Sequence, residues 1–251
     1  MLKVRDIKIG EGIPKIIVPL MGETAEELLT EVRAVKELVP DMVEWRADKY
    51  NEVKNIEKVK MMLSQLDEQL GHIPLLFTFR TIKEGGDTEI KENAYTDLLQ
   101  AVIESNNIDL VDIEYTLTKE TRNILVTSSK KHGIFVVMSS HDFKSTPNEG
   151  SIVSILAEMI DAGADLPKIA VMPNGIEDVF ILLQATNIMK KKYPAHPIIT
   201  MAMGKYGLIS RLAGEVFGSD ATFGAGRKAS APGQIHVADL RAVLKVIHQN
   251  S

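Results

Sequence analysis

The sequence predicts an α/β protein with the fold of a (β/α)8 barrel, the TIM barrel. Short apolar runs recur along the chain, amphipathic stretches separate them, and a repeat of roughly 30 residues fits eight times into 251 residues. Strands that are hydrophobic throughout are typical of a parallel sheet buried on both faces. A doubly wound open sheet uses the same right-handed βαβ unit, so periodicity alone leaves both folds open.

Eight apolar runs rich in Ile and Val are predicted to be the barrel strands. They span residues 16–18, 42–45, 75–79, 110–113, 134–138, 169–172, 198–201 and 221–223. Each run is short enough for a strand and is followed by a stretch with helical periodicity. This order predicts that every strand leads into a helix.

The helices are predicted from apolar stripes at helical spacing. In the stretch 24–39 the stripe consists of Leu28, Val32, Val35 and Val39. Thr24 and Glu27 have the spacing of a capping box, which predicts the start of this helix. The last helix has an apolar face made of Leu240, Val243, Leu244 and Ile247.

A small hairpin is predicted before the first barrel strand. Val4, Ile7 and Ile9 precede a Gly10-Glu11-Gly12 run, and we expect the hairpin to close the bottom of the barrel. No linker or low-complexity tract divides the chain. Residues 1–251 are therefore expected to form a single catalytic barrel domain.

The composition favours a small-molecule substrate over a polymer or a membrane. The formal charge of -5 and the pI of about 5.7 give no general attraction for nucleic acid or anionic lipid. No apolar run is long enough to span a bilayer, and the first residues do not form a secretory segment, so a cytoplasmic location is expected. The absence of Cys excludes thiolate metal sites and a cysteine nucleophile.

Lys168 stands out because a cationic side chain opens an apolar strand. One interpretation is a lysine whose head reaches solvent at the strand entrance. The other is an inward amine with a pKa lowered by burial, able to attack a ketone. Barrel chemistry belongs at the carboxyl ends of strands, and Lys168 lies early in its strand, which counts against the second interpretation.

His141 follows directly after the predicted strand 134–138 and two serines, at the end of the barrel that holds catalytic groups. A lone histidine is more often a bystander than an acid or base. Beside a Schiff-base lysine it gains a task, because imine chemistry needs a group that titrates near neutral pH.

Other strand ends carry charged pairs that we expect to converge on one polar site. The pairs are Glu44 with Arg46, Arg80 with Glu84, and Asp112 with Glu114. A spacing of two places both side chains of a strand pair on the same face. A single pair of this kind is usually a structural ion pair.

The segment 224–234 after the eighth strand is rich in Gly and contains Arg227 and Lys228. It is interpreted as an ordinary surface loop, a phosphate cradle or a lid over the substrate. Arg211, a little earlier in the chain, could clamp a carboxylate in bidentate fashion.

Many of these residues belong to six short motifs that are spread over most of the chain. They are Glu44-Trp45-Arg46, Arg80-Thr81 with Glu84-Gly85-Gly86, Ser140-His141-Asp142-Phe143, Pro167-Lys168-Ile169-Ala170, Met201-Ala202-Met203-Gly204 and Ser230-Ala231-Pro232-Gly233-Gln234. In this order, the motifs resemble those of the type I 3-dehydroquinate dehydratase family. The resemblance implies a dimeric barrel of the shikimate pathway that converts 3-dehydroquinate to 3-dehydroshikimate and water, without metal or cofactor.

The resemblance also implies roles for individual residues. Lys168 would form the imine, His141 would act as general acid and base, and Glu84 would orient His141. The substrate-binding residues implied are Glu44, Arg46 and Arg80 around the hydroxyls, Arg211 at the carboxylate, Ser230, Ala231 and Gln234 in the closing loop, and Met201, Met203 and Phe223 as apolar walls.

Two other functions fit part of this pattern. A class I aldolase or transaldolase also uses a Schiff-base lysine in a barrel but breaks a C–C bond, and its loop after the eighth strand would hold a phosphate. A non-catalytic barrel that binds a sugar acid would tolerate loss of the lysine.

Overall fold

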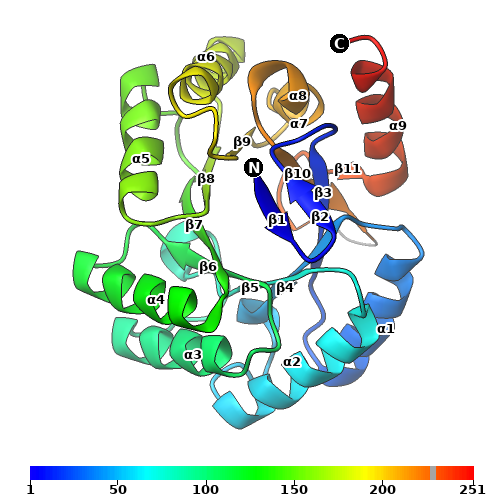
Figure 1. The fold of residues 1–251 in the computed structure, drawn as a ribbon, viewed down its shortest axis with the longest axis vertical. Helices are drawn as coiled ribbons and strands as arrows, with labels where there is room; N and C mark the ends of the chain where they lie inside the picture. The colour runs from blue at the N-terminus through cyan, green and yellow to red at the C-terminus, as the bar shows by residue number, and fades with distance from the viewer. Residues whose placement is uncertain (227–229) are drawn as a thin grey trace.

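The protein is a (β/α)8 barrel in the computed structural model, which describes residues 1–226 and 230–251 (Figure 1). The barrel strands are β3 (Lys15–Leu20), β4 (Met42–Arg46), β5 (Leu75–Thr78), β6 (Leu110–Glu114), β7 (Phe135–Asp142), β8 (Leu166–Val171), β9 (Ile199–Ala202) and β10 (Ala221–Ala225). They coincide with the eight predicted runs to within a few residues. The predicted fold is confirmed, and the open doubly wound sheet is wrong.

The strands follow one another round the barrel in parallel, from β10 to β3 and then in chain order to β9. A short strand β11 (Ile235–His236) pairs in parallel with the end of β10. Among the described residues no regular strand pairing joins β9 to β10, and the barrel closes there through single hydrogen bonds. The Asp220 amide donates to the Ile198 carbonyl at 2.8 Å, and the Thr200 amide donates to the Ser219 hydroxyl at 3.0 Å.

Helices cover the outside of the barrel. They are α1 (Ala25–Lys36), α2 (Ile56–Leu70), α3 (Glu92–Glu104), α4 (Lys119–His132), α5 (Glu149–Asp161), α6 (Ile176–Lys192), α7 (Leu208–Leu212), α8 (Gly214–Phe217) and α9 (Val237–His248). Two one-turn helices, η1 (Ala47–Lys49) and η2 (Ile82–Glu84), follow β4 and β5. The Thr24 hydroxyl caps α1 by accepting from the Glu27 amide, as predicted, whereas the Glu27 carboxylate accepts from Glu23 instead of Thr24.

Three residues of the predicted apolar stripes do not belong to the buried core. The first helix ends at Lys36, and Val39 beyond it has a positive φ of 50° and a 70% exposed side chain. In α9 the side chains of Leu240 and Leu244 are buried, but Val243 is 38% exposed and Ile247 is only partly buried. Spacing alone does not show where a helix ends or how much of its apolar face is covered by the rest of the protein, which explains these differences.

Inside the barrel, alternate residues of each strand point inward, and their chemistry changes along the strand. Toward the amino ends they are apolar and pack into one cluster with Ile17, Met42, Leu76, Leu110, Val137, Leu166, Ile199 and Ala221. Two and four residues further along, the same faces of β4 to β7 carry polar and charged side chains and β8 carries Lys168, whereas β9 and β10 remain apolar with Met201, Met203 and Phe223. The site is therefore a polar chamber above an apolar floor.

The amino-terminal hairpin lies against this floor. Strands β1 (Leu2–Val4) and β2 (Ile7–Ile9) pair in antiparallel fashion, and Val4 and Ile9 join the apolar cluster of the barrel. Its turn is Arg5-Asp6 rather than the Gly10 to Gly12 run. Arg5 fastens the turn through the carboxylates of Asp67 and Asp109, each at 2.6 Å. The hairpin that was predicted to close the barrel is confirmed.

Two other features bear on the predictions. No helix among the residues described is long and apolar enough to cross a membrane. The basic residues Arg227 and Lys228 of the segment after the eighth strand lie outside the described residues.

Candidate active site

Lys168 lies at the centre of the polar chamber. It is the third residue of β8, not the first as the sequence suggested, and it pairs in register with Ser139 of β7. Leu166 and Ala170, two residues away on either side, are inward residues of the apolar cluster, so Lys168 also faces the interior. Its side chain is 5% exposed, which rules out an amine that reaches bulk solvent at a strand entrance.

The amine of Lys168 has two carboxylates and an aromatic ring around it. Its Nζ lies 3.8 Å from Glu44 Oε1, 3.7 Å from Asp112 Oδ2 and 4.5 Å from the centre of the Phe223 ring. Burial lowers the pKa of Lys168, although Glu44 and Asp112 oppose the shift. A buried amine with a lowered pKa is partly neutral at a lower pH than an exposed lysine, and only the neutral amine is a nucleophile.

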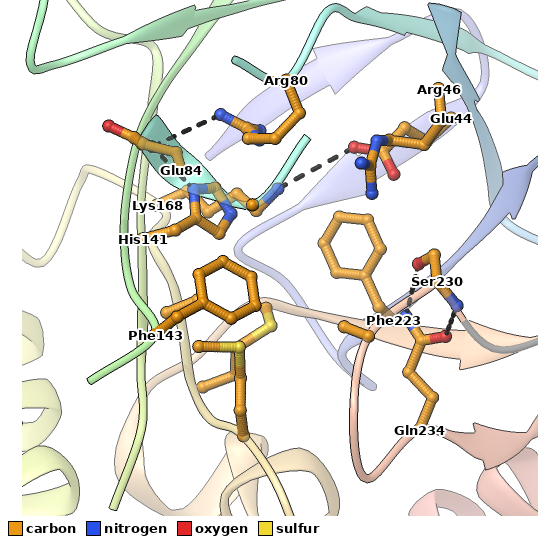
Figure 2. Close-up of a pocket in the computed structure, with 15 residues that line it drawn as sticks. Glu44, Arg46, Arg80, Glu84, His141, Phe143, Lys168, Phe223, Ser230 and Gln234 are labelled. Atoms are coloured by element: carbon orange, nitrogen blue, oxygen red, sulfur yellow. Dashed lines mark hydrogen bonds and ion pairs between the residues drawn. The ribbon is translucent and has the colours of Figure 1, made fainter. Parts of the chain in front are cut away.

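His141 and Glu84 form a hydrogen-bonded pair beside the lysine (Figure 2). The ring Nδ1 lies 2.9 Å from Glu84 Oε2, and His141 pairs in register with Ala170, two residues beyond Lys168 toward the mouth. Burial lowers the pKa of His141 well below its ordinary value, and burial raises the pKa of Glu84 to about 8. Both shifts favour the neutral form of the group concerned.

Arg80 ties the acidic groups of the chamber together. Its Nη2 lies 2.8 Å from Asp112, and its Nη1 lies 3.1 Å from Glu114, 2.8 Å from the Ser139 hydroxyl and 3.5 Å from Glu84. Buried charges of this kind are tolerated only where each one is paired. The predicted convergence of charged strand ends is thus present, with Arg80 at its centre.

Two more polar side chains are fixed by neighbours on the same face. Arg46 makes a bidentate pair with Asp48, at 2.8 and 2.9 Å, and Glu44 accepts a hydrogen bond from the Thr78 hydroxyl at 2.9 Å. These contacts hold the side chains of Arg46 and Glu44 in one orientation toward the pocket.

One pocket brings together nearly all the residues singled out in the sequence (Figure 2). Its lining includes Glu44, Arg46, Arg80, Glu84, His141, Lys168, Met201, Met203, Phe223, Ser230, Ala231 and Gln234. Ser230 and Gln234 lock the loop segment at the mouth, since the Gln234 amide group accepts from the Ser230 amide at 2.7 Å and donates to the Ser230 hydroxyl at 2.9 Å.

Arg211 lies next to this lining but is not part of it. Its side chain is buried at 1% exposure, and its guanidinium donates to the Pro232 carbonyl at 3.2 Å and contacts the sulfur of Met201 at 3.7 Å. Within the described part of the chain its Nε has no partner, and no carboxylate pairs with its guanidinium. Burial lowers the pKa of Arg211 to about 10. A buried cation of this kind is suited to receive an anion from outside the protein.

Sequence reasoning missed several residues that shape the pocket. Phe143 and Gly85 both line it, and a Cβ on Gly85, whose φ is +86°, would collide with the Phe143 ring. Ala170 lines it as well, and Asp48 fixes Arg46 from below the surface. The motif residues Phe143 and Gly85 stood in the sequence, but nothing in their spacing indicates that they meet.

The fold and the site define a class: a (β/α)8 barrel whose chamber presents a buried amine and a hydrogen-bonded histidine–glutamate pair, with a buried guanidinium beside it. The family model for type I 3-dehydroquinase matches residues 16–251. The chain belongs to the type I 3-dehydroquinase family, and the resemblance noted in the sequence is confirmed.

Similar proteins span the whole chain. A 3-dehydroquinate dehydratase of Bacillus velezensis is 52% identical over 249 residues, which are 99% of this chain and 98% of that protein. One of Bacillus subtilis is 49% identical over 251 residues, 100% of this chain and 98% of that protein. The crystal structure of a type I 3-dehydroquinate dehydratase from Clostridium difficile, with covalently modified comenic acid, has a TM-score of 0.97 at 44% identity and covers 100% of this chain and 98% of that one.

Proposed function

We propose that this protein is a 3-dehydroquinate dehydratase, a hydro-lyase that converts 3-dehydroquinate to 3-dehydroshikimate and water. Family membership supports the reaction, and so does the activity of relatives that are about 50% identical over the full length. The observation that carries the proposal within this molecule is the buried amine of Lys168 beside the His141–Glu84 pair.

In the proposed reaction Lys168 is the nucleophile. Its neutral amine attacks the ketone carbon, water leaves, and a protonated imine forms on Nζ. The imine withdraws electrons, so the neighbouring C–H becomes acidic; loss of that proton gives an enamine. The enamine electrons then expel the β-hydroxyl, which leaves as water once protonated, and a second water hydrolyses the imine to release the unsaturated ketone.

His141 is the group proposed to move these protons. Because its Nδ1 contacts Glu84, Nε2 is the nitrogen left for the substrate. A neutral imidazole at Nε2 can accept the α-proton and later return a proton to the leaving hydroxyl. Glu84 fixes the ring orientation and stabilises the imidazolium that forms after proton abstraction.

The remaining residues are proposed to bind the substrate. Arg211 takes the carboxylate, because its guanidinium is buried without an acidic partner among the residues described. Glu44, Arg46 and Arg80 contact the hydroxyls, while Ser230, Ala231 and Gln234 cover the mouth. Met201, Met203 and Phe223 form the apolar wall.

The proposal extends to the setting of the reaction, as the family resemblance implies. Residues 1–251 act as one catalytic domain, the protein works as a cytoplasmic homodimer, and the lysine supplies the electron sink that another enzyme would take from a metal or a cofactor.

The activity is tested by following the conjugated product by its ultraviolet absorbance after 3-dehydroquinate is added. Steady release of 3-dehydroshikimate is expected. A parallel sample with a phosphorylated ketose serves as the control for an aldolase. If an aldehyde forms from the ketose and no product forms from 3-dehydroquinate, the protein is an aldolase and the proposed function is wrong.

A further inference from the structure

The carboxylate of Glu84 has different partners on its two oxygens. Oε2 faces His141 Nδ1 at 2.9 Å and Arg80 Nη1 at 3.5 Å, inside the chamber. Oε1 accepts a hydrogen bond from the Thr116 hydroxyl at 2.8 Å. Glu84 itself is 2% exposed, so Thr116 approaches this buried carboxylate from the outer side.

Thr116 is held in place by the loop that carries it. This loop connects β6 to α4, and its backbone is tied down on both sides of the threonine. The Tyr115 amide donates to the Ser139 carbonyl at 2.8 Å, and the Leu117 amide donates to the Glu114 carbonyl at 3.3 Å. Thr116 is an exposed residue, but its hydroxyl is presented to Glu84 from a fixed backbone.

A hydroxyl in this position forms hydrogen bonds of different strength with the ionised and the neutral carboxyl group. It donates to an ionised carboxylate in a charge-assisted hydrogen bond, which is stronger than its bond to the neutral acid. The contact therefore favours ionised Glu84 and lowers its pKa, against the opposing effect of burial. An ionised Glu84 in turn stabilises a protonated His141.

We propose that Thr116 is a positioning residue that sets the proton affinity of the Glu84–His141 pair and holds the Glu84 carboxylate in the plane that His141 requires. The inference rests on the proposed function for its consequence in turnover, but the contact itself can be tested without substrate. Nothing in the motifs of the sequence pointed to Thr116.

Other charged groups also face this pair, and they remain unchanged in the variants below. Arg80, Asp112 and Glu114 act on Glu84, and Arg46, Arg80 and Lys168 act on His141. These groups come from β4, β6 and β8 and from the residues that follow β5. Thr116 is the partner that can be removed without touching any of these charges.

The test compares wild type with Thr116→Val and Thr116→Ser. Valine keeps the shape and removes the donor, whereas serine keeps the donor. Carbon-13 NMR of protein labelled at the glutamate carboxyl carbons gives the titration of Glu84 directly, with its resonance assigned by its loss in Glu84→Gln. A net hydrogen bond predicts an upward pKa shift of roughly half to one pH unit in Thr116→Val and a nearly unchanged value in Thr116→Ser.

The pH dependence of dehydration is the second readout. The limb that reports proton loss from the pair is expected to move upward by the same amount in Thr116→Val, and Thr116→Ser is expected to follow wild type. An identical Glu84 titration in wild type and Thr116→Val would overturn the inference, and so would an equal shift in both variants. If wild type titrates as expected but does not dehydrate 3-dehydroquinate, the proposed function fails while the role of Thr116 at the pair stands.

Discussion

His141 Nδ1 lies 2.9 Å from Glu84 Oε2. Burial lowers the pKa of His141 and raises the pKa of Glu84, so it favours the neutral form of each group. A histidine whose pKa is lowered readily gives up a proton that it has accepted. In the proposed reaction this relationship separates the role of the histidine from that of the lysine, because the lysine nitrogen is bound in the imine while the histidine remains free to take and return a proton.

The first prediction concerns this division of labour. His141→Ala is expected to lose more than about 10²- to 10⁴-fold in turnover, the usual value of acid–base catalysis in a single step, because it serves several steps. It should still form the imine slowly, with water as proton carrier. We expect a mass adduct on Lys168 that is slow to hydrolyse after incubation with substrate or product.

Glu84→Gln is the matched control for the histidine variant. It keeps a hydrogen-bonding group beside Nδ1 and should lose less activity than His141→Ala. Steady-state kinetics of both variants decide the assignment, and a mild loss in His141→Ala together with a severe loss in Glu84→Gln would reverse it.

Arg211 provides the second prediction. Arg211→Ala is expected to weaken binding of 3-dehydroshikimate by at least about 30-fold, because truncating one partner of a buried charge pair costs about 2 kcal/mol or more. Stability without ligand should change little, since the guanidinium has no acidic partner in the part of the structure described. Calorimetric titration measures the affinity.

Arg211→Met controls for the volume of the side chain. If either variant binds the product as tightly as wild type does, the carboxylate is held elsewhere.

The third prediction is a pH dependence of stability. The pKa of Glu84 is raised from 4.5 to about 8 in the folded protein, so between these values the folded state keeps a proton that the unfolded state has lost. The unfolding free energy contributed by this group is therefore full below about pH 4.5 and falls as the pH rises toward 8. Wild type should lose stability relative to Glu84→Gln over this range.

Urea unfolding of both proteins at several pH values measures the difference. A difference that stays constant, or one that grows in favour of wild type as the pH rises, would show that Glu84 is ionised throughout.

The hairpin under the barrel gives the fourth prediction. Arg5 joins its turn to Asp67 and Asp109, far from the chamber. Arg5→Ala is expected to cost about 1–3 kcal/mol of unfolding free energy through these lost charged hydrogen bonds, with little change in kcat/KM. Urea unfolding and steady-state kinetics on one preparation test both parts, and a large loss of activity in a stable variant would contradict the assignment of the hairpin to the floor.

Much of the fold could be read from the sequence because it depends on local pattern. Eight apolar runs and the stripes between them locate strands and helices, since both periodicities are properties of neighbouring residues. Val39 shows the limit: its spacing fits the first helix, but the helix ends at Lys36 and leaves it exposed. Where a helix ends depends on contacts that spacing does not encode.

Some features of the candidate site could also be predicted from the sequence, whereas others could not. Lys168, His141 and the charged strand ends could be found because each stands out within its own segment. Their distances could not, because the 2.9 Å contact between His141 of β7 and Glu84 of η2 joins residues that are far apart in the sequence. Thr116 and Phe143 were missed for the same reason, since each matters only through a residue far away in the sequence.

The most direct test of the account is reduction with borohydride in the presence of 3-dehydroquinate, followed by peptide mass spectrometry. The account predicts a reduced adduct on Lys168 in wild type, and no adduct and no dehydration in a folded Lys168→Ala variant. Normal turnover by Lys168→Ala, or an adduct located on another lysine of an active wild-type protein, would contradict the central claim that the buried amine of Lys168 forms the imine.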